Sequence, residues 1–135
     1  MTKEEIIAAL EMAADSGESF VLSQEVRQAM TGYPKPLELA EAVLDFIGTH
    51  PDTDFGKPGE LVHFVEHFSG RGYEELLAAS VRRTPTAHNI WMLHRCYHAP
   101  GDSRHDTYRE LILALRQADT TPKAVQQAIS SLSWD

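Results

Sequence analysis

The strongest catalytic pattern in the sequence is the segment His63-Phe64-Val65-Glu66-His67. It matches H-x-x-E-H, the motif with which inverzincin peptidases bind zinc. Two histidines four residues apart project from one side of a helix, where they can share a metal ion. Glu66 would then act as the general base. The pattern therefore raises one enzymatic hypothesis, a zinc-dependent hydrolase.

The neighbouring residues favour a different interpretation of these histidines. At about 100° per residue, a helical wheel places His63 and His67 roughly opposite the apolar side of the segment, which consists of Leu61, Phe64, Val65 and Phe68. The histidines should therefore face solvent, outside any dry cavity. Peptidases with this motif are several times longer, and the separation of their third ligand is not matched here by Glu74, Glu75 or Glu110. We expect two exposed histidines, no metal and no other cofactor.

A second pair of histidines, His94 and His98, also has i, i+4 spacing. The helix that carries them is apolar almost all round, so it should be central, with Trp91 largely buried and Cys96 a small buried hydrophobe. His94, Arg95 and His98 share its one polar edge. A four-histidine metal site would require both pairs to face each other, so we expect these three residues to tether neighbouring loops. We assign no catalytic residue.

Helices must position all of these side chains, because apolar residues recur at i, i+3, i+4 and i+7 along most of the chain. We predict helices at residues 2–16, 20–31, 36–49, 58–69, 72–83, 86–98, 104–118 and 122–132. The pattern indicates an all-α fold in a single domain over residues 1–135. About seven to eight short helices should stack as antiparallel hairpins, like an irregular HEAT or armadillo array. A compact bundle is the alternative.

Residues at the predicted helix ends support these boundaries. Thr2 and Glu5 have the spacing of a capping box. Thr121 should cap the last helix, with Pro122 at its first position. The start of the second helix is the open case, because residues 20–22 are Phe-Val-Leu and also fit an extended segment.

Composition bounds the class of protein. The chain has 135 residues, of which 42% are apolar and 24% charged, as is typical of one globular domain. Its one cysteine excludes an internal disulfide framework and a four-cysteine zinc site. The chain has no apolar run of the roughly 18 residues that span a membrane, and its acidic start lacks the apolar region of a signal peptide. We expect a soluble, cytoplasmic protein with no membrane partner.

The net charge is −8, from 20 acidic and 12 basic residues. This balance argues against a nucleic-acid partner and favours a basic protein partner. The excess is N-terminal, since residues 1–50 hold nine acidic and three basic residues. Helical spacing places two groups of acids on helix faces, and these are the candidate partner-binding residues: Glu11 and Asp15, and Glu38, Glu41 and Asp45. Alternatively, both groups are only solvated helix faces.

Several short motifs lie between residues 57 and 115, among them Gly72-Tyr73, Arg83-Thr84-Pro85-Thr86, Trp91-Met92-Leu93-His94-Arg95 and Tyr108-Arg109-Glu110-Leu111. Over this part, a little under half of the chain, the sequence resembles small all-helical immunity proteins of bacterial polymorphic toxin systems, including contact-dependent growth inhibition. The W-x-L-x-R stretch after the Pro-Thr turn is the most specific part. Where that pattern has asparagine, this sequence has His94 and His98, so the resemblance assigns these two positions no role.

The resemblance implies a binding protein with no catalysis of its own. Such proteins bind a cognate toxin domain in a 1:1 complex and block its active site. Their interfaces differ from pair to pair, so no binding residue is carried over. Many of these toxins are nucleases, which need basic surfaces for phosphates, and an acidic inhibitor can speed encounter and fill the cleft. We therefore expect an immunity protein for a basic toxin domain. The alternatives are a helical protein–protein adaptor or regulator and, third, the zinc-dependent hydrolase.

Overall fold

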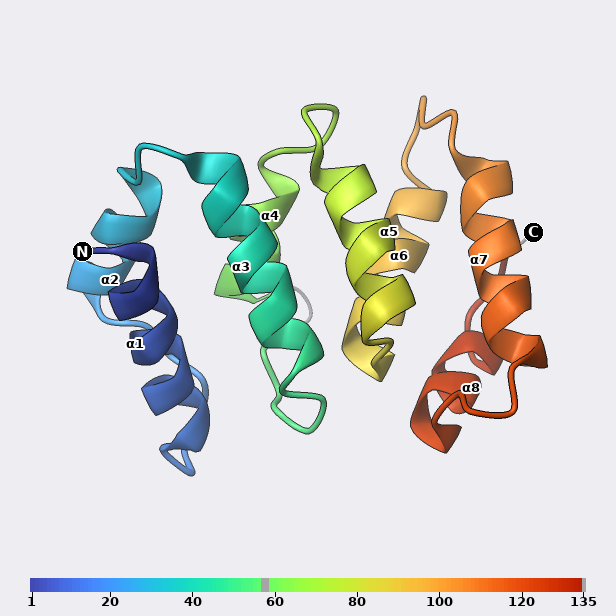
Figure 1. Cartoon of the computed structure of the whole chain (residues 1–135), viewed down its shortest axis with the longest axis horizontal. Coiled ribbons are helices and arrows are strands. Elements are labelled where there is room, and N and C mark those ends of the chain that lie inside the picture. Colours follow the sequence, from blue (N-terminus) through green and yellow to red (C-terminus); the bar gives the residue numbers. More distant parts are fainter. Residues whose placement is uncertain (57–58, 135) are drawn as a thin grey trace. The chain divides into compact units, whose positions relative to one another are not determined.

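The computed structural model describes residues 1–56 and 59–134, which contain eight α-helices and no strand (Figure 1). The helices are α1 (Lys3–Asp15), α2 (Gln24–Thr31), α3 (Pro36–Gly48), α4 (Glu60–Glu66), α5 (Tyr73–Arg83), α6 (Ala87–Tyr97), α7 (His105–Gln117) and α8 (Lys123–Ser130). The predicted all-α fold is confirmed, and each helix lies within its predicted range. The start predicted for the fourth helix, at residue 58, lies outside the described residues.

The second helix begins later than predicted, at Gln24 rather than at residue 20. Ser23 caps it, because the Ser23 hydroxyl accepts a hydrogen bond from the Val26 amide at 3.2 Å. Leu22 is buried just before this cap, and its amide donates to a Glu60 carboxylate oxygen at 3.1 Å. A contact with a residue 38 positions away thus anchors the segment before the helix, and residues 20–22 lie outside α2.

The predicted capping box at the start of α1 is confirmed. The Glu5 amide donates to the Thr2 hydroxyl at 3.1 Å, and the Thr2 amide donates to the Glu5 carboxylate at 2.9 Å. The predicted cap of α8 is wrong by one residue, because Pro122 occupies the capping position. The Thr121 hydroxyl instead donates to the Leu115 carbonyl at 2.7 Å, which fastens the turn to the end of α7.

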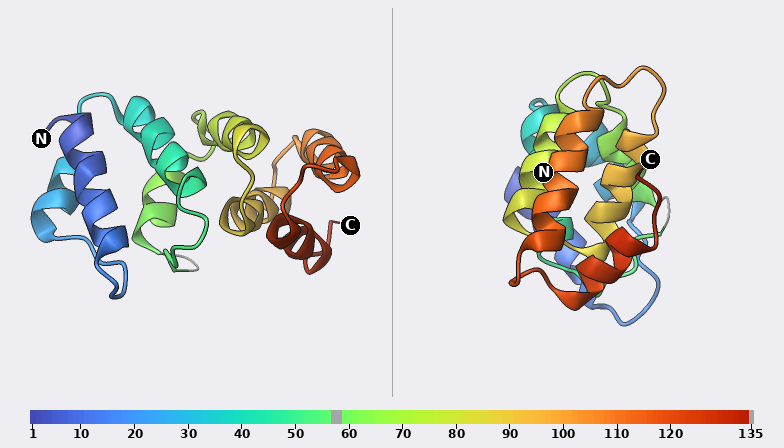
Figure 2. Two further views of the ribbon diagram at one scale, coloured as in Figure 1. Left: turned by 60° about the horizontal axis from the view of Figure 1, so that its bottom comes forward. Right: turned by 90° about the vertical axis from the view of Figure 1, so that its right-hand side faces the viewer.

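Contacts within the chain group it into two compact units, Met1–Tyr73 (unit 1) and Glu74–Asp135 (unit 2). The single domain predicted over residues 1–135 stays a prediction. Unit 1 has two layers, α1 with α3 and α2 with α4 (Figure 2). In it α3 packs against α1, α2 and α4. Three rings close one end of its core, with centroids 5.0 Å apart for Phe20 and Phe55 and 5.6 Å apart for Phe46 and Phe55.

In unit 2, α6 packs against α7 and α8, and α7 packs against α8. An ion pair and a turn fix the start of α7. Arg104 donates to the Glu75 carboxylate at 2.7 Å, and its amide donates to Asp102 at 2.8 Å. The Tyr108 hydroxyl donates to the same Asp102 carboxylate at 2.9 Å. Burial and this hydrogen bond raise the pKa of Tyr108 well above its ordinary value. These contacts join α5 to the N-terminus of α7.

The polar edge of α6, which the sequence analysis predicted, holds the C-terminal segment through hydrogen bonds. The His94 and His98 rings both contact the Ser133 carbonyl through Nε2, at 2.7 Å and 2.9 Å. The Tyr97 hydroxyl donates to the Trp134 carbonyl at 2.5 Å. The predicted tethering role of the two histidines is therefore confirmed, and the tethered segment is the C-terminal one.

Trp134, rather than Trp91, is the buried tryptophan. Trp134 is 9% exposed, donates from its indole nitrogen to the Ile129 carbonyl at 3.1 Å and packs its ring against Tyr97. The prediction that Trp91 is largely buried is wrong, because Trp91 is only half-buried and lies under the Arg95 guanidinium at 5.1 Å. Cys96 is buried, as predicted. Among the described residues, every helix is too short or too polar to cross a membrane.

Replacing Trp134 with alanine should lower the free energy of unfolding by about 3–5 kcal/mol, the usual cost of removing a large buried aromatic side chain. Trp91→Ala is the matched control and should cost clearly less, because part of that ring is already in contact with water. Urea denaturation followed by circular dichroism measures both losses. Equal losses for the two variants would contradict the assignment of Trp134 as the buried ring.

Candidate functional site

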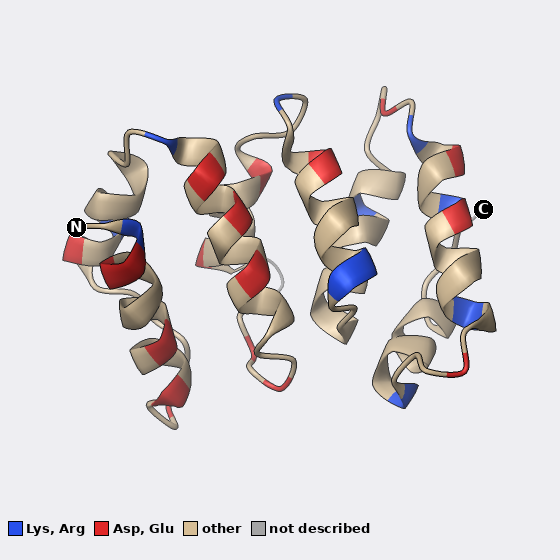
Figure 3. Ribbon diagram, viewed as in Figure 1, with Lys and Arg blue, Asp and Glu red and all other residues tan. Residues whose placement is uncertain are grey.

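The predicted partner-binding residues lie on two neighbouring helices of unit 1. Glu11 and Asp15 belong to α1, and Glu38, Glu41 and Asp45 belong to α3, which packs against α1. All five side chains are exposed. Figure 3 shows acidic segments along both helices on the side that faces the viewer. We call these five residues the acidic face, since the structure brings the two groups predicted separately onto adjacent helices.

The whole charge excess of the sequence belongs to unit 1. Residues 1–73 contain thirteen acidic and five basic residues, whereas residues 74–135 contain seven of each. Unit 1 therefore carries the entire net charge of −8. Charge at this density makes a long-range field that attracts cationic partners and repels anionic ones.

One member of the acidic face is already paired within the protein. The Lys3 ammonium of α1 lies 3.0 Å from the Glu38 carboxylate of α3, and Lys35 lies 4.0 Å from the same carboxylate. The hydrogen bond from Lys3 lowers the pKa of Glu38, and the charge of Lys3 lowers it further. Glu38 thus joins α1 to α3, and its charge is largely compensated.

The other side of the acidic face carries unpaired carboxylates and an apolar side chain. Glu11, Asp15 and Glu41 form no ion pair with any residue that the structure describes. Met12, between the two acids of α1, is 76% exposed. Methionine is enriched in protein interfaces, where its flexible side chain adapts to the partner. The acidic face therefore offers both charge for attraction and an apolar contact.

A hollow at the C-terminal end of α1 extends the acidic surface. It encloses about 490 Å³ and is lined by four acids, Glu18, Asp52, Asp54 and Glu60, together with Phe20 and Phe55. The sequence prediction missed Asp52 and Asp54 because they lie in a loop without periodicity. They add negative charge to unit 1 beyond the two helices.

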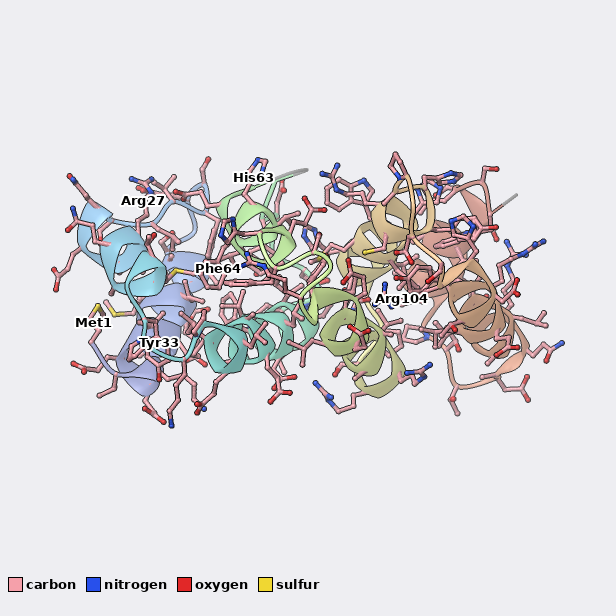
Figure 4. The ribbon with its side chains drawn as sticks, turned by 90° about the horizontal axis from the view of Figure 1, so that it is seen from above. Met1, Arg27, Tyr33, His63, Phe64 and Arg104 are labelled. Atoms are coloured by element: carbon pink, nitrogen blue, oxygen red, sulfur yellow. The ribbon has the colours of Figure 1, made fainter. Side chains whose placement is uncertain are left out.

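A groove of about 620 Å³ in unit 1 has the opposite character, and sequence analysis did not find it. We call it the aromatic–basic groove. Its lining comes from α2 and α4, from residues just before or after them and from the first residue of α3: Leu22, Arg27, Met30, Thr31, Tyr33, Pro36, Glu60, His63, Phe64, His67, Phe68 and Arg71. Figure 4 shows Arg27, His63 and Phe64 around the space between α2 and α4, with Tyr33 in the segment that joins α2 to α3. Tyr33 and Phe64 are half-buried, so their rings remain partly open to solvent.

Two arginines of the groove are held in place. Arg27 forms an ion pair with Glu60, and Arg71 donates to the His67 carbonyl at 2.7 Å while its guanidinium lies 5.4 Å from the centroid of the Phe68 ring. Partial burial opposes the ionisation of Glu60, but hydrogen bonds from Arg27 and the Leu22 amide outweigh it and lower the pKa of the Glu60 carboxyl. Both arginines therefore already have contacts within the protein.

The histidines of the H-x-x-E-H segment are exposed, as the helical wheel predicted. His63 and His67 lie at the solvent side of α4, and Glu66 is half-buried. In the described part of the chain, His, Cys, Asp and Glu form no group of three or more that could hold a metal ion. The two histidines line the aromatic–basic groove instead, and Phe64 lines it with them. The wheel placed Phe64 on the apolar side, but its side chain is only half-buried.

Comparison of the chain with protein-family models, with curated proteins and with solved structures found no match.

Replacing Glu60 with glutamine should destabilise the protein by about 0.5–1 kcal/mol at pH 7, a value kept small because the carboxylate is partly exposed. The lowered pKa means that ionised Glu60 stabilises the fold above the ordinary carboxyl pKa, and that this contribution is lost as the pH falls through the folded-state value. The difference between wild type and variant should therefore shrink as the pH falls below the ordinary carboxyl pKa. Urea denaturation at several pH values measures it, with Glu41→Gln as the control, because Glu41 is exposed and has no ion pair with any described residue.

The free energy of unfolding of the double variant His63→Ala, His67→Ala should lie within about 0.5 kcal/mol of the wild-type value, because both side chains are exposed. Thermal denaturation followed by circular dichroism checks the fold, and metal analysis of both purified proteins accompanies it. One zinc ion per chain in the wild type that is lost in the variant would overturn the assignment of these histidines to a solvent-facing groove.

Proposed function

We propose that this protein is an immunity protein: it binds a cognate toxin domain through the acidic face and covers the active site of that toxin. The observation that carries the proposal is the concentration of the net charge of −8 in unit 1, where the acidic face is exposed on α1 and α3. The resemblance of the segment between residues 57 and 115 to all-helical immunity proteins supports the same function. The protein acts by binding and performs no reaction itself.

A basic toxin domain suits such a surface for an electrostatic reason. An enzyme that cleaves nucleic acid must present cationic groups to the phosphates. An acidic inhibitor is attracted to the same groups, which raises the rate of encounter and disfavours partners of like charge. Binding at the cationic cleft excludes the substrate, so inhibition follows from occupancy alone.

The members of the acidic face have different roles in this proposal. Glu11, Asp15 and Glu41 are exposed and unpaired among the described residues, so they supply most of the attraction. Glu38 is compensated by Lys3 and contributes by holding α1 beside α3. Met12 offers the apolar contact that completes an interface core.

Reversing two charges of the acidic face, with Glu11→Lys and Glu41→Lys, should slow association with the toxin on the order of tenfold and leave the fold intact. Exposed rim charges act mainly on the on-rate, and salt screens them, so the effect should shrink at high ionic strength. A large secreted protein with a variable C-terminal domain, encoded directly upstream, would favour this function, and its C-terminal domain is the toxin to test. Surface binding kinetics at low and high salt measure both rates.

The matched control reverses two exposed acids of unit 2, with Glu110→Lys and Asp119→Lys, so that the total charge changes equally. It should slow association much less. Equal effects of the two double variants would contradict the acidic face as the binding surface. Failure of the wild-type protein to bind that domain or to protect cells that express it would overturn the proposed function itself.

A further inference from the structure

We propose that the aromatic–basic groove binds a short extended segment of a protein partner, in which a bulky apolar side chain is flanked by aspartate or glutamate. The groove lies between α2 and α4, in the layer of unit 1 opposite the α1–α3 layer that carries the acidic face (Figure 4). The inference goes beyond the proposed function and does not rest on toxin binding.

The floor of the groove fits an apolar side chain. Its volume of about 620 Å³ lies within the range of about 300–1,000 Å³ that is usual for ligand sites. Leu22, Met30 and Phe68 form a buried floor, and the rings of Tyr33 and Phe64 remain half-buried at the sides. An inserted leucine, methionine or aromatic ring would remove these exposed apolar surfaces from water, which is favourable at roughly 25 cal/mol per Å².

The charges around the floor favour a partner segment in which an acidic residue stands next to the inserted apolar side chain. Two of the five Lys and Arg residues of unit 1, Arg27 and Arg71, line the groove, and so do two of its three histidines, His63 and His67. The one carboxylate among the lining residues is Glu60, and it is paired with Arg27. Because Arg27 and Glu60 compensate each other, Arg71 gives the lining a small positive charge within a unit of net charge −8. This segregation gives the groove complementarity to an acidic segment rather than to a basic one.

The cationic groups are also pre-positioned for carboxylates. Arg71 is held by the His67 carbonyl and by the face of Phe68. A guanidinium has five donors, so one bond to the His67 carbonyl leaves others to engage a carboxylate. Because these two contacts already restrain the side chain, binding should lose less conformational entropy than it would at an uncontacted lysine.

A groove with aromatic and cationic residues also resembles a site for single-stranded nucleic acid. The charge of the surrounding unit argues against that occupant. A polynucleotide would extend its phosphates beyond the groove over a surface with a net charge of −8 and would be repelled there. A peptide segment confines its negative charge to two or three side chains, all of which can lie near Arg71 and the histidines.

The test selects a random seven-residue peptide library, displayed on phage, against the full chain. Enriched peptides should carry aspartate or glutamate within two positions of phenylalanine, tryptophan, leucine or methionine. Fluorescence polarisation of labelled peptides then compares the wild type with Arg71→Glu, which should weaken binding at least about tenfold, equivalent to about 1.4 kcal/mol. Arg82→Glu is the matched control, since Arg82 is equally a surface arginine but belongs to unit 2, and it should leave binding unchanged.

A second variant tests the aromatic side of the groove. Phe64→Ala should weaken the same peptides at least about tenfold, and circular dichroism establishes that it is folded. The double variant His63→Ala, His67→Ala provides an independent probe of the rim if Phe64→Ala unfolds. Any of four results would overturn the proposal. In the selection, these are no enrichment at all or enrichment of basic peptides. In the binding measurements, they are equal effects of Arg71→Glu and Arg82→Glu, or tighter binding of a labelled twelve-residue oligothymidylate than of any selected peptide.

Discussion

Helix α3 contacts each of the other three helices of unit 1, because apolar residues cover most of its circumference. Seven of its thirteen residues are buried, Leu39, Ala40, Val43, Leu44, Phe46, Ile47 and Gly48. Isolated helices of seven to thirteen residues are marginal in water, so α1, α2 and α4 depend on this burial for their stability. The place of every functional side chain in unit 1 therefore follows from how its helix packs against α3.

The same packing decides which side of α1 and α3 remains for charge. Once the apolar stripe of each helix is turned inward, Glu11 and Glu41 have only the outer side available, and the ion pair between Lys3 and Glu38 joins the two outer sides. The acidic face is thus a consequence of core formation and not a separate feature. This explains why charge reversal at exposed positions can alter binding while the core, and with it the fold, is unaffected.

The second layer has a different surface because its helices are short and less completely covered. Helix α4 spans seven residues, and Phe64 on its groove side remains half-buried beside Tyr33. Glu60 connects this layer internally, since it pairs with Arg27 and accepts a hydrogen bond from the Leu22 amide. Unit 1 consequently has two surfaces of opposite character, which suit partners of opposite chemistry.

The sequence by itself determined the helices, since each one lies inside its predicted range, and the outward direction of His63 and His67. It also determined the candidate acids, because the helical period reports which side of a helix is apolar and which is charged. Only the tertiary structure decided that Trp134 is buried and Trp91 half-buried, that α2 begins at Gln24, and that Arg27, Tyr33, Phe64 and Arg71 form one groove. The reason is physical: the period of one helix specifies its apolar side but does not specify which distant residues will cover it. The contacts that decide these features, from Leu22 to Glu60 and from Tyr97 to Trp134, join residues 38 and 37 positions apart.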